Sequence, residues 1–203
     1  MGPFATGLLA GYGIAIPVGA IAVLILGTGI QSGFRRAAIA GAGAASADLL
    51  YSAVAVVGGA ALSDLITSLD AGLKIASALV LTVIAVSGLH RAGLARGTPA
   101  PADDSRSLLV RTYLRFLGLT IINPTTIVYF AALVIGLGVA SDMSPIDGGL
   151  FVAGTFLASL SWQTTLAATG AFTGRRLSLG AQRAAIVAGN LLILAFAGAI
   201  LLR

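Results

Sequence analysis

Residues 37–63 read AAIAGAGAASADLLYSAVAVVGGAALS, and this stretch decides the fold of the chain. A helix needs about 20 mainly apolar residues to cross the hydrocarbon core of a bilayer, and this stretch is long enough. Its one charge, Asp48, lies close to the middle. A carboxylate at that depth costs roughly 2.5–3.5 kcal/mol on insertion scales, so we expect Asp48 to point into the protein.

At helical spacing, Asp48 shares one face with small and polar residues. These are Gly41, Ala44, Ala45, Tyr51, Ser52 and Ala55. Small residues let another helix or a substrate approach closely, and the hydroxyls of Tyr51 and Ser52 are placed to bond the carboxylate. Asp48 either pins two helices together or marks a pathway or proton relay. We favour the second interpretation, because that is the usual role of ionisable groups inside a membrane.

The composition indicates a polytopic membrane protein. Of 203 residues, 58% are hydrophobic and 9% are charged, whereas a soluble domain has about 25% charged residues. With no cysteine and one histidine, the chain has neither disulfides nor a thiolate or histidine-cluster metal site, and we expect no cofactor. The net charge of +5 comes from arginines in short loops and does not indicate nucleic-acid binding.

Six hydrophobic segments predict an all-α integral membrane protein with six transmembrane helices. We expect spans at residues 3–28, 37–63, 72–90, 113–140, 148–172 and 184–202. Short loops are expected at 27–36 and at 63–71, where Asp64 and Asp70 lie. Residues 91–112 form the one long polar segment, and residues 97–105 within it have the composition of a flexible linker.

The distribution of basic residues predicts the orientation. If the N-terminus is outside, ten of the 12 Lys and Arg residues lie inside and two, Lys74 and Arg203, lie outside. The inner residues are Arg35, Arg36, Arg91, Arg96, Arg106, Arg111, Arg115, Arg175, Arg176 and Arg183. The positive-inside rule therefore predicts a multi-pass protein of the cytoplasmic membrane with both termini outside.

Two prolines suggest an internal repeat. Three spans at residues 1–93, a cytoplasmic linker at 94–112 and three spans at 113–203 predict two three-helix repeats. An odd number of spans makes the repeats inverted relative to each other. Pro17 and Pro124 lie near the middle of the first and fourth spans, where proline interrupts a helix. Matching interruptions in two halves indicate a transporter binding site.

The predicted interruptions also have suitable chemistry. A broken helix exposes backbone N–H groups and the positive end of a helix dipole, which suit a carboxylate. Unwound carbonyl groups and Asp48 suit an ammonium group or a proton. A site with both features fits a zwitterion such as an amino acid, without selecting among amino acids.

These motifs resemble the L-lysine exporter (LysE) family, including its RhtB-type branch, over most of the chain. The family's P-x-G-P motif reads Pro17-Val18-Gly19-Ala20 here, the acid of the second segment ends Gly43-Ala44-Ala45-Ser46-Ala47-Asp48, and the N-P-K-type motif reads Asn123-Pro124-Thr125. Ala20 replaces a frequent second proline, so a milder interruption is expected. Thr125 replaces a frequent lysine, so a charge expected beside the substrate or Asp48 is missing.

The resemblance implies a secondary transporter that exports amino acids or related small solutes in exchange for protons. In this hypothesis Asp48 is the coupling group, and four residues of the interruptions shape a midplane site through their backbone geometry. Tyr51 and Thr125 are further candidates. The candidate substrate- and proton-binding residues are Asp48, Pro17, Gly19, Asn123, Pro124, Tyr51 and Thr125.

Other interpretations stay open. The main alternative is an exporter of a different solute in the same superfamily, such as a cation or a lipid-linked substrate. An intramembrane enzyme is disfavoured, because Ser46 and Asp48 lie on different helix faces and His90 is expected far from the midplane. The Gly7/Gly11 pair packs either within the subunit or in a homodimer, and the pair Trp162–Gln163 either lines a cavity or packs.

Overall fold

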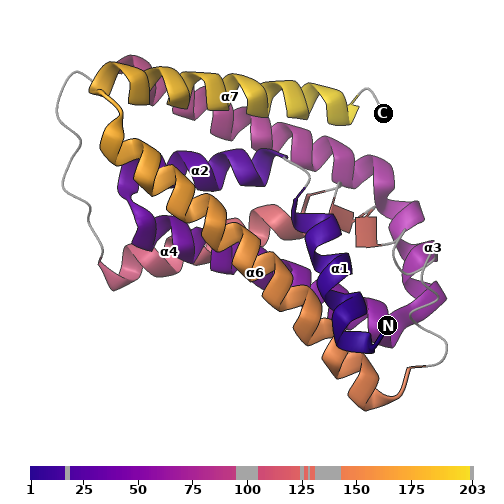
Figure 1. Cartoon of the computed structure of the whole chain (residues 1–203). Coiled ribbons are helices and arrows are strands. Elements are labelled where there is room, and N and C mark those ends of the chain that lie inside the picture. Colours follow the sequence, from indigo (N-terminus) through magenta and orange to yellow (C-terminus); the bar gives the residue numbers. More distant parts are fainter. Residues whose placement is uncertain (17–18, 95–104, 124–125, 128, 131–142, 202–203) are drawn as a thin grey trace.

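The computed structural model describes residues 1–16, 19–94, 105–123, 126–127, 129–130 and 143–201. Every regular element in these ranges is an α-helix, which confirms the predicted all-α class (Figure 1). The helices are α1 (Pro3–Ala15), α2 (Ala20–Ser32), α3 (Phe34–Leu94), α4 (Arg106–Ile121), α6 (Pro145–Arg176) and α7 (Leu179–Leu201).

Three helical stretches are long and apolar enough to cross a membrane: Phe34–Gly58, Pro145–Arg176 and Gly180–Ala199. The pair α1 and α2 adds a fourth if it is counted as one bent span, and Ala78–His90 is a shorter apolar helix. Helices of this length and composition identify a multi-pass membrane protein. The described residues thus support three or four spans, and the predicted number of six stays a prediction.

The first predicted span consists of two helices. α1 ends at Ala15, α2 begins at Ala20, and the two helices are bent by 78° relative to each other. Gly19 caps α2 in an extended conformation, with φ −122° and ψ −173°. The chain therefore has a break where the sequence predicts one, although Pro17 itself lies outside the described residues.

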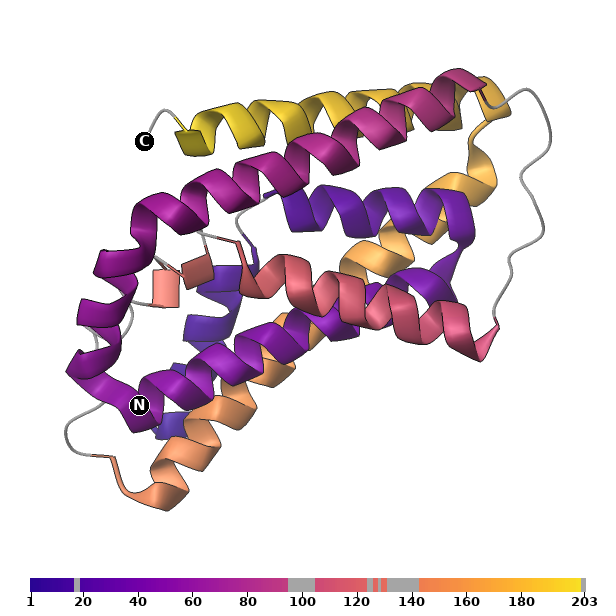
Figure 2. The ribbon, with the colours of Figure 1, turned by 180° about the vertical axis from the view of Figure 1, so that it is seen from behind.

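The predicted loop at residues 63–71 is wrong. α3 continues through this segment from Phe34 to Leu94, and its ribbon changes direction along the way (Figures 1 and 2). No proline occurs between Pro17 and Pro99, and the segment SDLITSLDA contains residues that a helix accepts at small cost. Asp64 and Asp70 therefore do not end the helix.

The loop expected at residues 27–36 is also wrong, because a single residue, Gly33, connects α2 to α3. Its φ of +82° lies in the left-handed region, which glycine adopts without steric cost. α4 begins at Arg106, inside the segment assigned to the linker. There Arg36 of α3 donates a 3.4 Å hydrogen bond from Nε to Thr112 Oγ1 of α4.

α6 packs against three helices through glycine. A Cβ atom on Gly11 of α1 would lie 2.5 Å from the carbonyl oxygen of Thr155. One on Gly174 would lie 2.6 Å from the carbonyl oxygen of Ile30 in α2, and one on Gly41 of α3 would lie 2.9 Å from Gln163 Cβ. Such close backbone approach is typical of helix pairs in membranes. The Gly7/Gly11 motif therefore packs within the subunit, where Gly7 faces the backbone of Phe151.

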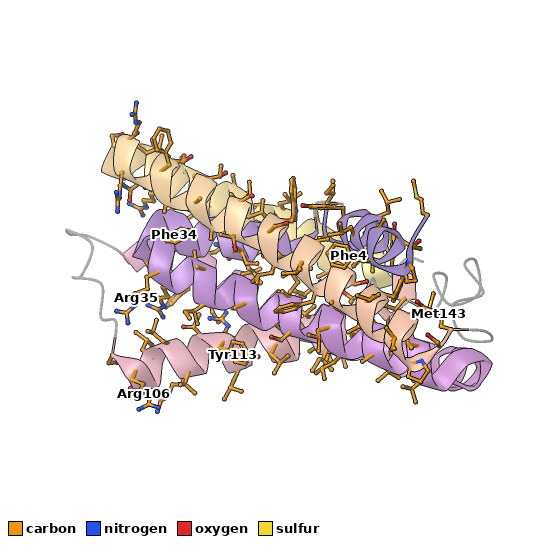
Figure 3. The ribbon with its side chains drawn as sticks, turned by 60° about the horizontal axis from the view of Figure 1, so that its bottom comes forward. Phe4, Phe34, Arg35, Arg106, Tyr113 and Met143 are labelled. Atoms are coloured by element: carbon orange, nitrogen blue, oxygen red, sulfur yellow. The ribbon has the colours of Figure 1, made fainter. Side chains whose placement is uncertain are left out.

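α7 covers the second half of α3 and the start of α2 (Figures 1 and 2). The buried residues of this contact are Ala20, Ala78, Leu81, Ala85, Ile193 and Ala197. Figure 3 shows Arg35 and Arg106 at one end of the molecule and Phe4 and Met143 toward the other. The basic starts of α3 and α4 therefore share an end, as the charge distribution predicts for one side of a membrane.

Replacing Gly11 with alanine is expected to separate α1 from α6, because the new Cβ would also lie 2.8 Å from Ala158 Cβ. Overpacking of this kind typically costs about 1–3 kcal/mol. The expected result is a lower unfolding temperature of the purified protein in detergent. Gly118→Ala in α4 is the matched control, because a Cβ there meets no atom within 4 Å. An equal effect of both substitutions would contradict the packing argument.

Candidate functional site

Asp48 lies in the interface between α3 and α6. Its side chain is 3% exposed, and its Oδ2 accepts a 2.6 Å hydrogen bond from Ser159 Oγ of α6. Ala44, Ala45 and Ala55 on the same face of α3 are fully buried. The carboxyl group therefore points into the protein, as its position in the span predicts, and its partner comes from a different helix.

Tyr51 and Ser52 do not supply the hydrogen bonds that the sequence led us to expect. Ser52 Oγ donates to the Leu49 carbonyl at 2.9 Å, within α3, as serine in a helix often does. The Tyr51 hydroxyl donates to the carbonyl of Ile121. Each hydroxyl has one proton to donate, so the expected bonds to Asp48 are wrong.

Tyr51 instead ties α3 to the end of α4. The last carbonyl groups of a helix lack partners within it, and the Tyr51 hydroxyl satisfies one of these, on Ile121. The ring of Tyr51 stacks on Phe130, with centroids 5.3 Å apart and an interplanar angle of 21°. Tyr51 therefore links α3 to the end of α4, one helical turn from Asp48.

Asn123 follows the end of α4. Its Nδ2 donates to Thr126 Oγ1 at 3.1 Å, and its carbonyl accepts from the Ile127 N–H at 3.2 Å. The next two predicted site residues, Pro124 and Thr125, lie outside the described residues. The Asn-Pro motif thus coincides with a helix end in the described part of the second half, as a break near Pro17 does in the first.

The two helix ends meet at a small pocket. It is lined by Ala20, Ile21, Val80, Leu81, Leu119, Ile122 and Asn123. These residues come from the start of α2, the second half of α3 and the end of α4. The pocket's volume of about 10 Å³ is close to the lower limit for one water molecule, so in this conformation it is closed to a larger solute.

The structure thus divides the described candidates between two places. Asn123 lines the pocket, and Gly19 caps the helix whose first turn forms part of it. Asp48 lies in the seam between α3 and α6, bonded to Ser159. Tyr51 connects the two places, because it follows Asp48 by one turn and bonds the end of α4.

Sequence reasoning did not assign Ser159 as the partner of Asp48. Ser159 belongs to a row of buried polar residues spaced by four along α6, with Thr155 and Gln163, which are 0% and 6% exposed. Thr155 Oγ1 donates toward the carbonyls of Gly7 and Phe151 at 3.2 and 3.1 Å. The four-residue spacing is visible in the sequence and indicates one polar face on an otherwise apolar helix.

The broken first span, the buried acid and the Asn-Pro motif at a helix end can be compared with known protein families. The LysE type translocator family model matches residues 13–203. The chain belongs to this family. No curated protein and no solved structure matches the chain significantly. As a LysE-type translocator, the protein is a membrane transporter, and the resemblance to the LysE family is confirmed.

In this translocator, Ser159→Ala is expected to leave the buried Asp48 carboxyl group without its 2.6 Å donor. Losing one partner of a buried polar pair costs about 1–3 kcal/mol, so the unfolding temperature in detergent should fall. Thr169→Val, which removes an exposed hydroxyl bonded to the Thr165 carbonyl within α6, should have a smaller effect. Equal stability of wild type and Ser159→Ala would show that the bond contributes nothing to the fold.

Tyr51→Phe removes the hydroxyl bond to Ile121 and keeps the ring that stacks on Phe130. A hydrogen bond of this kind contributes about 1 kcal/mol, which corresponds to a factor of roughly 5 in a local opening equilibrium. Amide hydrogen exchange at the end of α4 should therefore accelerate about fivefold.

The matched control is Tyr113→Phe, which removes a 2.8 Å bond from α4 to Ser46 of α3. Its effect should centre on the middle of α4. If Tyr51→Phe left amide exchange near Ile121 unchanged, the Tyr51 hydroxyl bond would not stabilise the end of α4.

Proposed function

We propose that this translocator exports amino acids or related small solutes across the cytoplasmic membrane in exchange for protons, with Asp48 as the coupling group. The observation that carries the proposal is the burial of Asp48 between α3 and α6. Among the residues whose burial the structure describes, Asp48 is the one buried charged side chain. Ionisable groups in such positions are expensive and usually serve transport.

Proton exchange requires a group whose interactions differ between its two protonation states. A carboxylate accepts hydrogen bonds, whereas a carboxylic acid also donates one. Protonation of Asp48 therefore changes the hydrogen bonds that its carboxyl group can make with Ser159 across the α3–α6 interface. Because these helices belong to the two proposed repeats, residues 1–93 and 113–203, the charge on Asp48 acts at their contact.

Substrate is proposed to enter at the meeting point of the two helix breaks. The start of α2 presents N–H groups and the positive end of a helix dipole, which attract a carboxylate. Asn123 adds a side-chain amide at the same pocket. Because this pocket holds about 10 Å³, transport requires the repeats to move apart, as in the rocking of inverted repeats about a central site.

The proposed orientation follows the charges. We place the end that carries Arg35 and Arg106 in the cytoplasm and both termini outside. Figure 3 supports this proposal to the extent that these two arginines share one end of the molecule. Membership of a translocator family favours transport over intramembrane catalysis, and export of another solute of the superfamily is the alternative that the experiment below tests.

The experiment reconstitutes the protein in liposomes with an acidic interior and measures uptake of a panel of labelled amino acids. Protons leaving the vesicle should drive accumulation of one class of amino acid. Asp48→Asn should reduce this gradient-driven accumulation to the level of protein-free vesicles, because an asparagine side chain cannot bind and release a proton.

Asp147→Asn is the matched control, since Asp147 lies in the first turn of α6 and pairs with the exposed Ser144. Accumulation that survives in Asp48→Asn would leave Asp48 with a structural role. If folded wild-type protein moved no amino acid, the substrate would belong to another class.

A further inference from the structure

Gln163 has a buried oxygen that lacks a hydrogen-bond partner. The residue is 6% exposed, and its Oε1 accepts no hydrogen bond from any residue that the structure describes. Most buried side-chain polar atoms in proteins have a partner, so each exception needs an explanation. A ligand that is bound only in another step of the transport cycle would explain why Gln163 Oε1 has no partner here.

The position of Gln163 relates this oxygen to Asp48. α3 and α6 run antiparallel here, because Gly148 faces Val56 and Ser159 bonds Asp48 further along. Side chains on a helix lean toward its N-terminus and cover the preceding turn. Gln163 therefore leans toward the turn that holds Ser159, and Asp48 leans in the opposite direction along the seam. This rule places both polar ends toward one layer between the helices.

The facing part of α3 has no polar side chain to fill this layer. Gly41 contributes no side chain and packs directly on Gln163, where an added Cβ would lie 2.9 Å from Gln163 Cβ. Ala44 and Ala45, the next turn toward Asp48, are fully buried methyl groups. Neither alanine can donate a hydrogen bond to the amide oxygen of Gln163, and neither adds a side-chain acceptor. The side-chain acceptors that we assign to this layer are therefore the oxygens of Asp48, Ser159 and Gln163.

We infer that Gln163 is a ligand-binding residue of a site that also comprises Asp48 and Ser159, and that this site takes a primary ammonium group. The inference rests on the proposed function and adds a specificity-determining residue to it. A primary ammonium group has three N–H donors, and a carboxylate, a hydroxyl oxygen and an amide carbonyl supply three acceptors. Ser159 Oγ retains lone pairs for this purpose while it donates to Asp48.

A proton satisfies less of this arrangement than an ammonium group does. Protonation of Asp48 supplies a single O–H donor, which can bond one acceptor of the layer at a time, such as the unpartnered Gln163 Oε1. An ammonium group bonds all three residues at once. It enters when the seam between α3 and α6 opens, since Asp48 is 3% exposed in the present conformation.

The test uses Trp162, the one tryptophan of the chain and the neighbour of Gln163 in sequence. Its fluorescence in the detergent-solubilised full-length protein is titrated with n-propylammonium chloride, potassium propionate or sodium chloride at constant ionic strength. Wild type should give a saturable change with propylammonium and none with the other two salts. Gln163→Leu should weaken this binding about tenfold, since a bond to a charged group is lost.

Two further variants keep the outcome interpretable. Gln163→Met retains an unbranched side chain without a strong acceptor, so it serves if the leucine variant does not fold, and it should weaken binding to a similar extent. Thr164→Val is the matched control, because the Thr164 hydroxyl bonds the Leu160 carbonyl within α6 at 2.7 Å. Asp48→Asn should abolish the saturable change.

Unchanged propylammonium affinity in both Gln163 variants would overturn the inference, and so would an equal response to sodium or no saturable change in folded wild type. Transport separates this result from the proposed function. Wild-type amino-acid transport with an unaltered KM in Gln163→Met would retain the function and reject the role of Gln163. Propylammonium binding that depends on Gln163, in a protein that transports no amino acid, would retain the site and reject the function.

Discussion

Direct backbone contact between α6 and its neighbours is the constraint on which the rest of the structure depends. Helices in a bilayer gain little from hiding apolar surface from one another, so they associate through close packing. Glycines on α1, α2, α3 and α6 provide that contact at several points along α6. With no intervening side chains, the polar row on α6 is held at a fixed position against α3. Asp48 has a donor from another helix as a consequence.

The sequence predicted the class of the protein, the break near Pro17 and the inward direction of Asp48. These features depend on composition, on local backbone chemistry and on the cost of a charge in hydrocarbon. Each of these can be judged from a single segment of the sequence, without knowing which helices pack against it. The helix through residues 63–71 differs from the loop that two aspartates in a polar stretch predict. Charge alone does not end a helix that contains neither proline nor glycine over that stretch.

The partners of the site residues could not be predicted from local patterns. Helical spacing places Tyr51 near Asp48, but it does not reveal that the end of α4 is within reach of the Tyr51 hydroxyl. Ser159 lies 111 residues from Asp48 in the sequence, and periodicity does not show which helices are neighbours. The spacing of Thr155, Ser159 and Gln163 did mark a polar face on α6, so this part of the site was accessible from sequence.

The two polar regions of the structure have different chemistry. The pocket at the helix breaks combines the N-terminal end of α2 with the amide of Asn123, whereas the seam pairs the Asp48 carboxyl group with the Ser159 hydroxyl and, in our inference, with the amide oxygen of Gln163. An amino acid has one end suited to each. If its ammonium group binds at the seam, it needs Asp48 as an unprotonated acceptor. A proton on Asp48 converts part of that acceptor into a donor and removes the charge that attracts the ammonium group. Proton and substrate would then exclude each other at one carboxyl group, and their exchange becomes obligatory when the repeats do not change access while Asp48 is charged and unoccupied.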